Sequence, residues 1–120
     1  VAEGVDGYIY LATAGSGISR YDGVSFEHFT NKVELGGLYF FEIAVVTDAI
    51  WFGGDDHMLE YKDGSWRNYE IEGAGEIRQI LVYDADRLFC VGSNFSFFFS
   101  RANVEQEKVE IRDVKINQGI

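Results

Sequence analysis

Asp55, Asp56 and His57 form the most polar cluster within an otherwise apolar and aromatic stretch of the chain. Two carboxylates and an imidazole are ligand types that bind divalent cations. The side chains of three consecutive residues point in different directions, however, and rarely converge on one centre. We therefore expect a solvated turn, in which Asp accepts hydrogen bonds from backbone N–H groups, and no metal site.

The remaining residue types that could do chemistry lack the partners that catalysis requires. A nucleophilic Ser or Cys needs a supported His nearby, and no Gly-x-Ser-x-Gly motif is present. His28, beside Phe29, is expected to be a partly exposed residue of a sheet. No glycine-rich phosphate loop precedes a helix. We predict a protein that is not an enzyme, with no catalytic residues and no cofactor. Pairs of Asp or Glu that hydrolyse glycosides remain an open alternative, because an acidic chain contains many such pairs.

The polar cluster belongs to a sequence repeat that occurs twice. One copy covers residues 50–69, and a divergent copy covers residues 9–29. Equivalent positions lie about 40 residues apart; Trp51, for example, follows Tyr10 by 41 residues. A fainter third copy begins at Leu88. A period near ~40 with short apolar strands is typical of the four-stranded blade of a β-propeller, whereas helical repeats need long stretches with apolar residues every three or four positions.

The composition is that of a folded domain rich in strands and turns. The 120 residues are 47% hydrophobic and 16% aromatic, which excludes a disordered chain. Fourteen glycines supply tight turns, and the absence of proline leaves every strand able to donate hydrogen bonds. No secretory leader is recognisable, and Val1 in place of Met suggests an excised or processed segment.

The charge balance argues against several partners. The net charge is −10, from 20 acidic and 10 basic residues, and no cluster of Lys or Arg is visible. Nucleic acid and anionic membrane surfaces both attract basic patches, so we predict no nucleic-acid partner and no membrane contact from this segment. The single cysteine, Cys90, is expected to be a small buried apolar side chain.

These observations together predict an all-β fold. We expect one segment, residues 1–120, of about three four-stranded antiparallel blades, which form a partial β-propeller that is incomplete on its own. The expected blades cover residues 1–34, 35–74 and 75–116. The last strand of the third blade is expected at residues 108–111.

The same architecture predicts a binding face. Three equivalent turns, together with the connections between blades, should emerge on one face of the propeller. Loops on a rigid scaffold are where binding residues concentrate. The candidate ligand-binding residues of these turns are Ser16, Asp55, Asp56, His57, Ser93 and Asn94.

Aromatic residues also recur at blade spacing. A platform that stacks sugars is one interpretation. Their equivalent strand positions favour the other, a core between neighbouring blades. The residues concerned are Tyr10, Trp51, Phe89, Phe26 and Trp66.

The repeat resembles the two-component regulator propeller family. Members typically read Ile-Trp-Ile-Gly-Thr, then a Gly-Leu pair, then Tyr-Asp-Gly, and close with an aromatic pair. The second copy departs at Gly54 and Met58, and the third copy lacks the Tyr-Asp-Gly turn. The matching stretches are Ala12-Thr13, Gly17-Ile18 and Tyr21-Asp22-Gly23 in the first copy and Ile50-Trp51-Phe52-Gly53 and Asp63-Gly64 in the second.

This resemblance implies a non-catalytic ligand-sensing or interaction propeller of a signalling receptor, periplasmic or extracellular, with carbohydrate as the expected ligand. The alternatives are a scaffold for protein–protein contacts and a fragment of a propeller hydrolase or lyase. Two or three blades do not close a ring, so each terminal blade should leave one apolar face open. The expected partner is therefore the remainder of a longer propeller chain or a second copy of this chain.

Overall fold

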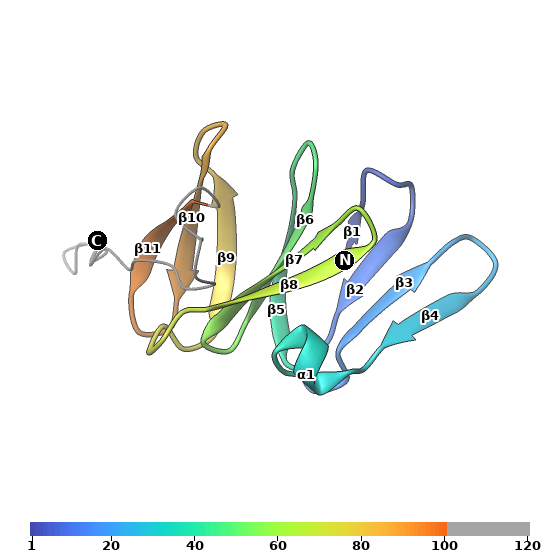
Figure 1. Ribbon diagram of the computed structural model, residues 1–120, viewed down its shortest axis with the longest axis horizontal. Coiled ribbons are helices and arrows are strands. Elements are labelled where there is room, and N and C mark those ends of the chain that lie inside the picture. Colours follow the sequence, from blue (N-terminus) through green and yellow to red (C-terminus); the bar gives the residue numbers. More distant parts are fainter. Residues whose placement is uncertain (101–120) are drawn as a thin grey trace.

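The computed structural model describes residues 1–100, which form eleven strands and one short helix (Figure 1). The strands build three antiparallel sheets. The first sheet contains β1 (Ala2–Glu3), β2 (Ile9–Ala12), β3 (Ile18–Tyr21) and β4 (Phe26–Phe29). The second contains β5 (Phe40–Val45), β6 (Ile50–Gly54), β7 (His57–Lys62) and β8 (Ser65–Glu70). The third contains β9 (Ile77–Val82), β10 (Arg87–Gly92) and β11 (Ser96–Ser100).

This arrangement confirms the prediction of an all-β chain with small antiparallel sheets. Four strands were predicted in each, and the third sheet has three strands within residues 1–100. Each sheet falls within one of the three predicted segments. The strand predicted at residues 108–111, and the end of the segment 75–116, lie outside the described residues.

Within each sheet the strands follow one another as a meander, because tight turns connect consecutive strands. The turn between β7 and β8 illustrates the local chemistry. Asp63 and Gly64 both have positive φ, 50° and 78°, and the flanking Lys62 and Ser65 pair directly across the strands. Two positive φ values in a two-residue turn match the right-handed twist of the strands, and Asp-Gly tolerates them well.

The connection from the first to the second sheet contains a helix that the sequence did not lead us to expect. Helix α1 (Lys32–Leu35) has only one turn. The side chain of Asn31 accepts hydrogen bonds from the backbone of Val33 and Glu34, and Gly36 ends the helix with φ 78°. An Asn cap and a left-handed Gly are sufficient to define one turn, even without an apolar periodicity.

The second sheet packs between the other two, and all five residues of β6 are buried. Ile50 and Phe52 face the first sheet, where Phe52 lies edge-on to Tyr10 with the ring centroids 6.1 Å apart. Burial on both faces explains why β6 is apolar at every position, with no alternation.

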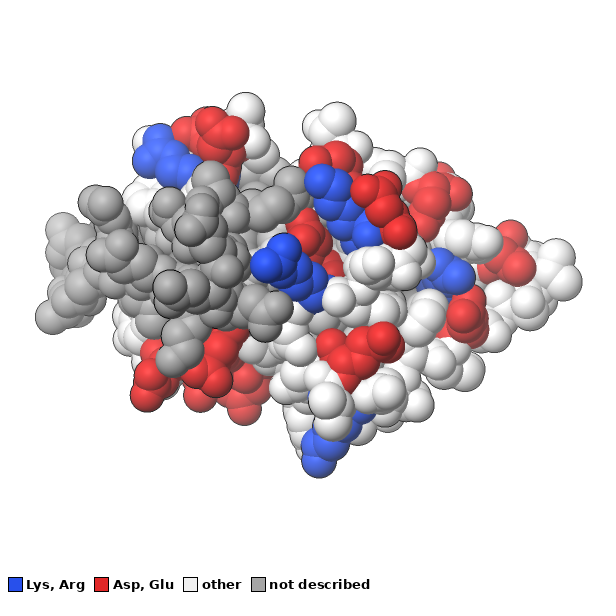
Figure 2. Space-filling model, in the orientation of Figure 1, with Lys and Arg blue, Asp and Glu red and all other residues white. Residues whose placement is uncertain are grey.

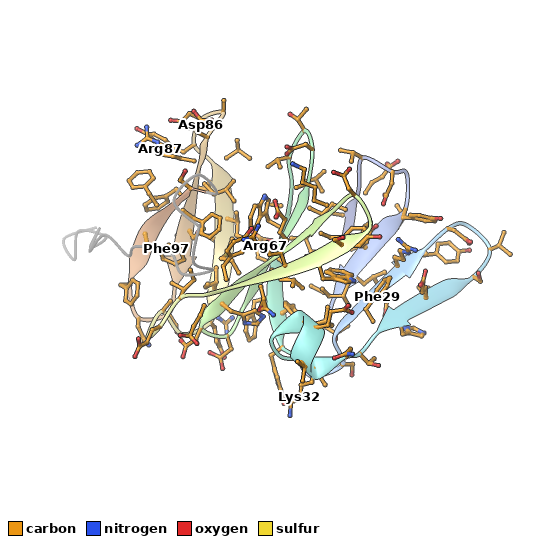
Figure 3. The ribbon with its side chains drawn as sticks, viewed as in Figure 1. Phe29, Lys32, Arg67, Asp86, Arg87 and Phe97 are labelled. Atoms are coloured by element: carbon orange, nitrogen blue, oxygen red, sulfur yellow. The ribbon has the colours of Figure 1, made fainter. Side chains whose placement is uncertain are left out.

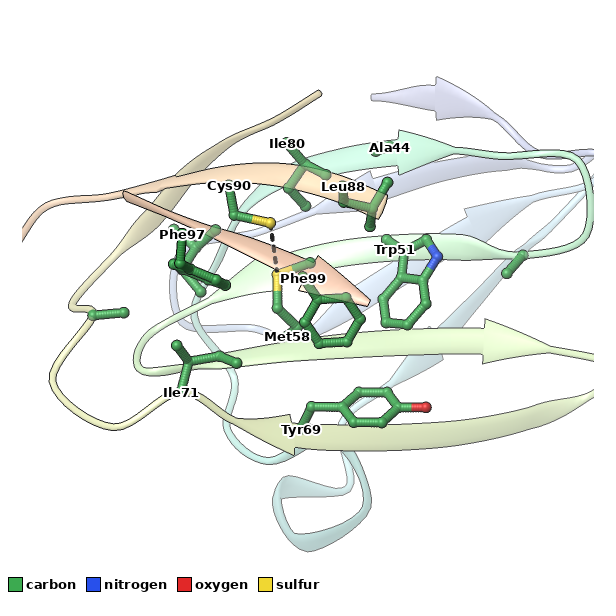
Figure 4. Close-up of a cluster of buried hydrophobic side chains, with 13 residues drawn as sticks. Ala44, Trp51, Met58, Tyr69, Ile71, Ile80, Leu88, Cys90, Phe97 and Phe99 are labelled. Carbon is green, nitrogen blue, oxygen red and sulfur yellow. Dashed lines mark hydrogen bonds between the residues drawn. The ribbon is translucent and has the colours of Figure 1, made fainter. Parts of the chain in front are cut away.

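The opposite face of the second sheet packs on the third sheet (Figure 4). Trp51 lies edge-on to Phe99 at 4.9 Å, and the Cys90 sulfur is 4.0 Å from that of Met58. Cys90 is fully buried, as predicted. Burial raises the pKa of its thiol to about 12, because the thiolate would be desolvated there.

The outer faces of the first and third sheets are open among residues 1–100. Phe26 was predicted to be core, and this prediction is wrong, because 55% of its surface is exposed. It lies on the outer face of the first sheet, beside Tyr21. On the outer face of the third sheet, Leu81 is 57% exposed. His28 is exposed on β4, as expected.

Candidate functional site

The turns and connections divide between two ends of the stacked sheets (Figure 1). We call one the connection end; it holds the connections between sheets, residues 30–39 and 71–76, and the second turn of each sheet. We call the other the hairpin end; it holds the first and third turns of the sheets. Figure 3 shows Lys32 of α1 at the connection end and Asp86 and Arg87 at the hairpin end.

Five of the six predicted ligand-binding residues lie in turns of the connection end, and the sixth, His57, begins the strand that follows one of these turns. Asp56 shows what the turn residues do there. Its carboxylate Oδ1 accepts a hydrogen bond from the Gly75 backbone at 2.6 Å, and its own N–H donates to the Gly75 carbonyl at 2.9 Å. The Asp56 carbonyl accepts from the Ile71 N–H at 2.8 Å. Asp56 therefore fixes the connection that leads to the third sheet, in agreement with the expected turn whose Asp binds backbone N–H groups.

Ser93 and Asn94 bind the same connection from the other side. Ser93 Oγ accepts from the Glu76 N–H at 3.0 Å, and the Asn94 amide donates to the Gly73 carbonyl at 2.9 Å. The structure thus brings Asp56, Ser93 and Asn94 together around one backbone segment. Their polar atoms are used to hold that segment.

His57 was predicted to lie in a solvated turn, and this prediction is wrong, whereas its role in ligand binding stays a prediction. It begins β7, and only 5% of its surface is exposed. Nδ1 lies 3.1 Å from the Asp55 carbonyl, and Nε2 lies 3.0 Å from the Leu35 carbonyl at the end of α1. The ring turns inward because Gly54 leaves room for it; a Cβ on Gly54 would be 2.1 Å from the ring. The histidine clamps α1 to the second sheet.

Ser16 and Asp55 complete the predicted set. Ser16 lies in the turn before β3, where its N–H donates to the Thr13 hydroxyl. Asp55 forms an isolated β-bridge with Glu76. Ser16 belongs to the first sheet and is not among the residues that bind the connection 71–76. Among residues 1–100, no group of three or more His, Cys, Asp or Glu side chains is placed to hold a metal ion.

Two cavities lined by residues 1–100 lie at the hairpin end. The smaller, of about 280 Å³, lies between the first and second sheets. Its lining combines aromatic rings with side chains of both charges, which are the groups that orient a polar ligand. The residues of this lining that matter below are Asp6, Tyr8, Arg20, Asp48, Tyr61 and Lys62.

Arg20 organises this cavity. Its guanidinium donates to Glu27, with an N–O distance of 2.7 Å, and to the hydroxyl of Tyr61 at 3.2 Å, and it covers the ring of Tyr8 at 4.4 Å. Partial burial opposes the charge, but the hydrogen bonds to Tyr10, Glu27 and Tyr61 raise the pKa of Arg20 above its usual range. Arg20 is therefore a fixed cation that joins the first sheet to the second.

The hydroxyl of Tyr10 continues this network. It donates to Oδ2 of Asp6, a residue of the cavity lining, at 2.6 Å. Burial, and then the bond to Asp6, raises the pKa of Tyr10 well above its usual range, so the phenol stays protonated at neutral pH.

The larger cavity, of about 530 Å³, lies between the second and third sheets. Buried Trp51, Leu88 and Phe99 form its apolar part. Asp84 and Arg87 line it as an ion pair at 2.7 Å, and the bond to Arg87 lowers the pKa of the Asp84 carboxyl. The cavity thus offers an apolar surface next to charged groups.

The sequence did not predict these two cavities. The available signal was the pairing of acidic turns with aromatic strand positions at the same end of the sheets. The wedge between two sheets depends on how they pack, and spacing along the chain does not reveal it.

Comparison with family models, curated proteins and solved structures gives no match for this chain. What the structure itself defines is an all-β protein of three stacked antiparallel sheets, with a connection end held by polar side chains and a hairpin end with cavities. No helix within residues 1–100 is long and apolar enough to cross a membrane.

Proposed function

We propose that this chain is a segment of a β-propeller, about three blades long, that acts as a non-catalytic ligand-sensing or interaction module of a signalling receptor. The observation that carries the proposal is the position of the second sheet, which is buried on both faces by sheets of the same repeat. A propeller is the architecture in which every sheet is covered in this way.

The pattern of packing supports the proposal in detail. Tyr10 of the first sheet and Trp51 of the second are equivalent, and each packs on an aromatic residue of the following sheet. Two successive interfaces therefore use the same positions, as they do in a radial repeat.

The ligand would bind at the hairpin end. The two cavities combine aromatic or apolar walls with a few charged groups, whereas the polar residues of the connection end already hold backbone. A carbohydrate ligand and a periplasmic or extracellular location follow from the family resemblance and are part of the proposal. The face shown in Figure 2 carries dispersed charges of both signs.

The test is isothermal titration calorimetry with a panel of neutral oligosaccharides. We expect a measurable heat of binding, and an affinity that decreases roughly 5- to 30-fold in Tyr8→Ala or Arg87→Ala, because one lost aromatic or charged contact costs about 1–2 kcal/mol. The matched control is Glu72→Ala, an exposed residue of the connection end, which should bind as the wild type does.

Two other outcomes contradict the proposal. Absence of binding across the panel would favour a scaffold for protein contacts, which the open apolar faces of the outer sheets also suit. Turnover of a glycan would favour a fragment of a hydrolase or lyase.

A further inference from the structure

We propose that the outer face of the first sheet binds the outer face of the third sheet of a second copy, head to tail, with Tyr21 of one copy against Phe89 of the other. This inference rests on the proposed function, because it extends the packing between successive sheets to the two sheets at the ends of the segment. Figure 1 shows these two sheets on opposite sides of the second sheet.

The internal interfaces provide the template for this contact. In the first interface, Tyr10 packs on Tyr61, with ring centroids 6.1 Å apart. In the second, Trp51 packs on Phe99 at 4.9 Å. Each contact joins an aromatic residue of the second strand of one sheet to an aromatic residue of the third strand of the next.

Strand register identifies the residues that occupy these positions on the open faces. Tyr61 pairs with Ile50, Phe99 pairs with Leu88, and Tyr21 pairs with Ile9 in the same way. Tyr21 therefore occupies, in the first sheet, the third-strand position on which an aromatic residue of a preceding sheet would pack; we call it the acceptor position. No preceding sheet is present in residues 1–100.

The second-strand position whose aromatic residue packs on the following sheet, which we call the donor position, is found by the same rule. Tyr10 follows Ile9 and Trp51 follows Ile50, so Phe89, which follows Leu88, is the donor of the third sheet. Leu88 and Cys90 on either side of Phe89 face the second sheet, and Phe89 faces outward with its neighbour Phe98, at 5.1 Å between ring centroids.

The surroundings of the two positions also match the internal interfaces. Tyr21 is flanked on its face by Phe26, which is 55% exposed and equivalent to Trp66 of the second sheet. Phe89 pairs with Leu81, which is 57% exposed. Exposed apolar side chains in such groups mark interaction surfaces.

A second copy is the occupant because one chain carries both halves of the interface. A donor on one end and an acceptor on the other give a heterologous contact, which forms closed rings or open chains according to the angle between copies. A contact of the same face with itself would be isologous, and the two arrangements can be separated by experiment.

The experiment measures mass by analytical ultracentrifugation at micromolar concentration for the wild type, Tyr21→Glu and Phe89→Glu. The wild type is expected to form dimers or larger species. Each variant alone should be monomeric, with self-association weakened at least about thirty-fold, the factor that corresponds to a hot-spot loss of about 2 kcal/mol.

Mixing the two variants gives the decisive result. Tyr21→Glu keeps an intact Phe89 face, and Phe89→Glu keeps an intact Tyr21 face, so an equimolar mixture should form a one-to-one dimer that cannot extend. If Phe89→Glu alone still associates and Tyr21→Glu does not, the contact is isologous and the proposal is wrong.

Two further variants guard against misfolding. Phe26→Lys and Leu81→Lys change side chains that are more than half exposed, on the same two faces, and should reproduce the monomeric behaviour and the rescue on mixing. A wild type that stays monomeric overturns the head-to-tail contact. If that monomer still binds oligosaccharide, the proposed function stands and only this inference fails.

Discussion

Turn carboxylates accept backbone N–H groups at both ends of the sheets, but only at the hairpin end do charged side chains also line the two cavities described above. At the connection end, Asp56, Ser93 and Asn94 bind the backbone of the segment that joins the second sheet to the third. At the hairpin end, Arg20 and the Asp84–Arg87 pair line cavities. A connection that leaves a sheet loses its strand partner, and its N–H and C=O groups must be satisfied by other means. A cluster of polar residues in a turn can therefore indicate structure as readily as binding.

The largest effect should come from the core that both ends share. Phe52→Ala removes a fully buried ring between the first and second sheets and should cost about 3–5 kcal/mol of unfolding free energy. Denaturant unfolding followed by circular dichroism measures this loss. Exposed Val24→Ala is the control, with a change within about 0.5 kcal/mol. Two separate unfolding transitions in Phe52→Ala would show that the two ends of the sheets unfold independently and share no core.

The next effect concerns the interior between the second and third sheets at alkaline pH. Burial raises the pKa of Cys90 from 9.0 to about 12, so the folded state holds the thiol proton more tightly than the unfolded state. The contribution of the protonated thiol to the unfolding free energy is fully present below pH 9 and is lost as the pH rises toward 12. At pH 10.5 the unfolding free energy should be lower by roughly 2 kcal/mol.

The control for this pH dependence is Cys90→Ala. Its unfolding free energy should change less between pH 8 and pH 10.5 than that of the wild type, which unfolding in urea at the two pH values measures. An identical pH dependence in both proteins would show that the thiol is not desolvated.

A smaller effect is expected at the connection end. Asp56→Ala removes the acceptor for the Gly75 N–H and should lower the unfolding free energy by about 1–2 kcal/mol, with no change in ligand affinity. Asp56→Asn is the matched variant, because its side-chain oxygen can still accept the bond and Asn tolerates the positive φ of 58° at this position. Loss of ligand binding without loss of stability in Asp56→Ala would show that the connection end, and not the hairpin end, binds the ligand.

The smallest effect is expected at the hairpin end in acid. Because Arg87 lowers the pKa of Asp84, the pair stabilises the fold above the unfolded pKa of 3.8, and this contribution is lost as the pH falls through the folded pKa. Both side chains are exposed, so the change is small and salt should weaken it. Acid titration of wild type and Arg87→Gln, followed by the NMR shifts of Asp84, measures the difference. An unchanged midpoint would contradict the pairing.

Much of the fold could be predicted from the sequence, because turns and strands are local. Asp63-Gly64 defines its turn through its own backbone preferences, and the uninterrupted apolar run at β6 indicates a strand covered on both faces. Helix α1 was missed because an Asn cap and a left-handed Gly define a single turn without periodicity.

The candidate site could be predicted only in part. The repeat places six polar residues at one end, but which atoms they meet depends on packing between sheets. His57 turns inward because Gly54 leaves room for its ring and because the carbonyl of Leu35, 22 residues away in sequence, lies within hydrogen-bond distance of Nε2. The cavities depend on the angle between sheets, and no local signal encodes that angle.

Hydrogen exchange followed by NMR tests the contrast between the two ends most directly. The account predicts that the amide protons of Asp56 and Gly75 exchange about as slowly as those of β6. The amide proton of Ala85, in a turn of the hairpin end, should exchange much faster, because the bonded amides of that turn are those of Asp84 and Asp86. Exchange at Asp56 and Gly75 as fast as in an unprotected turn would contradict it, because the polar residues of the connection end would then be free to bind a ligand.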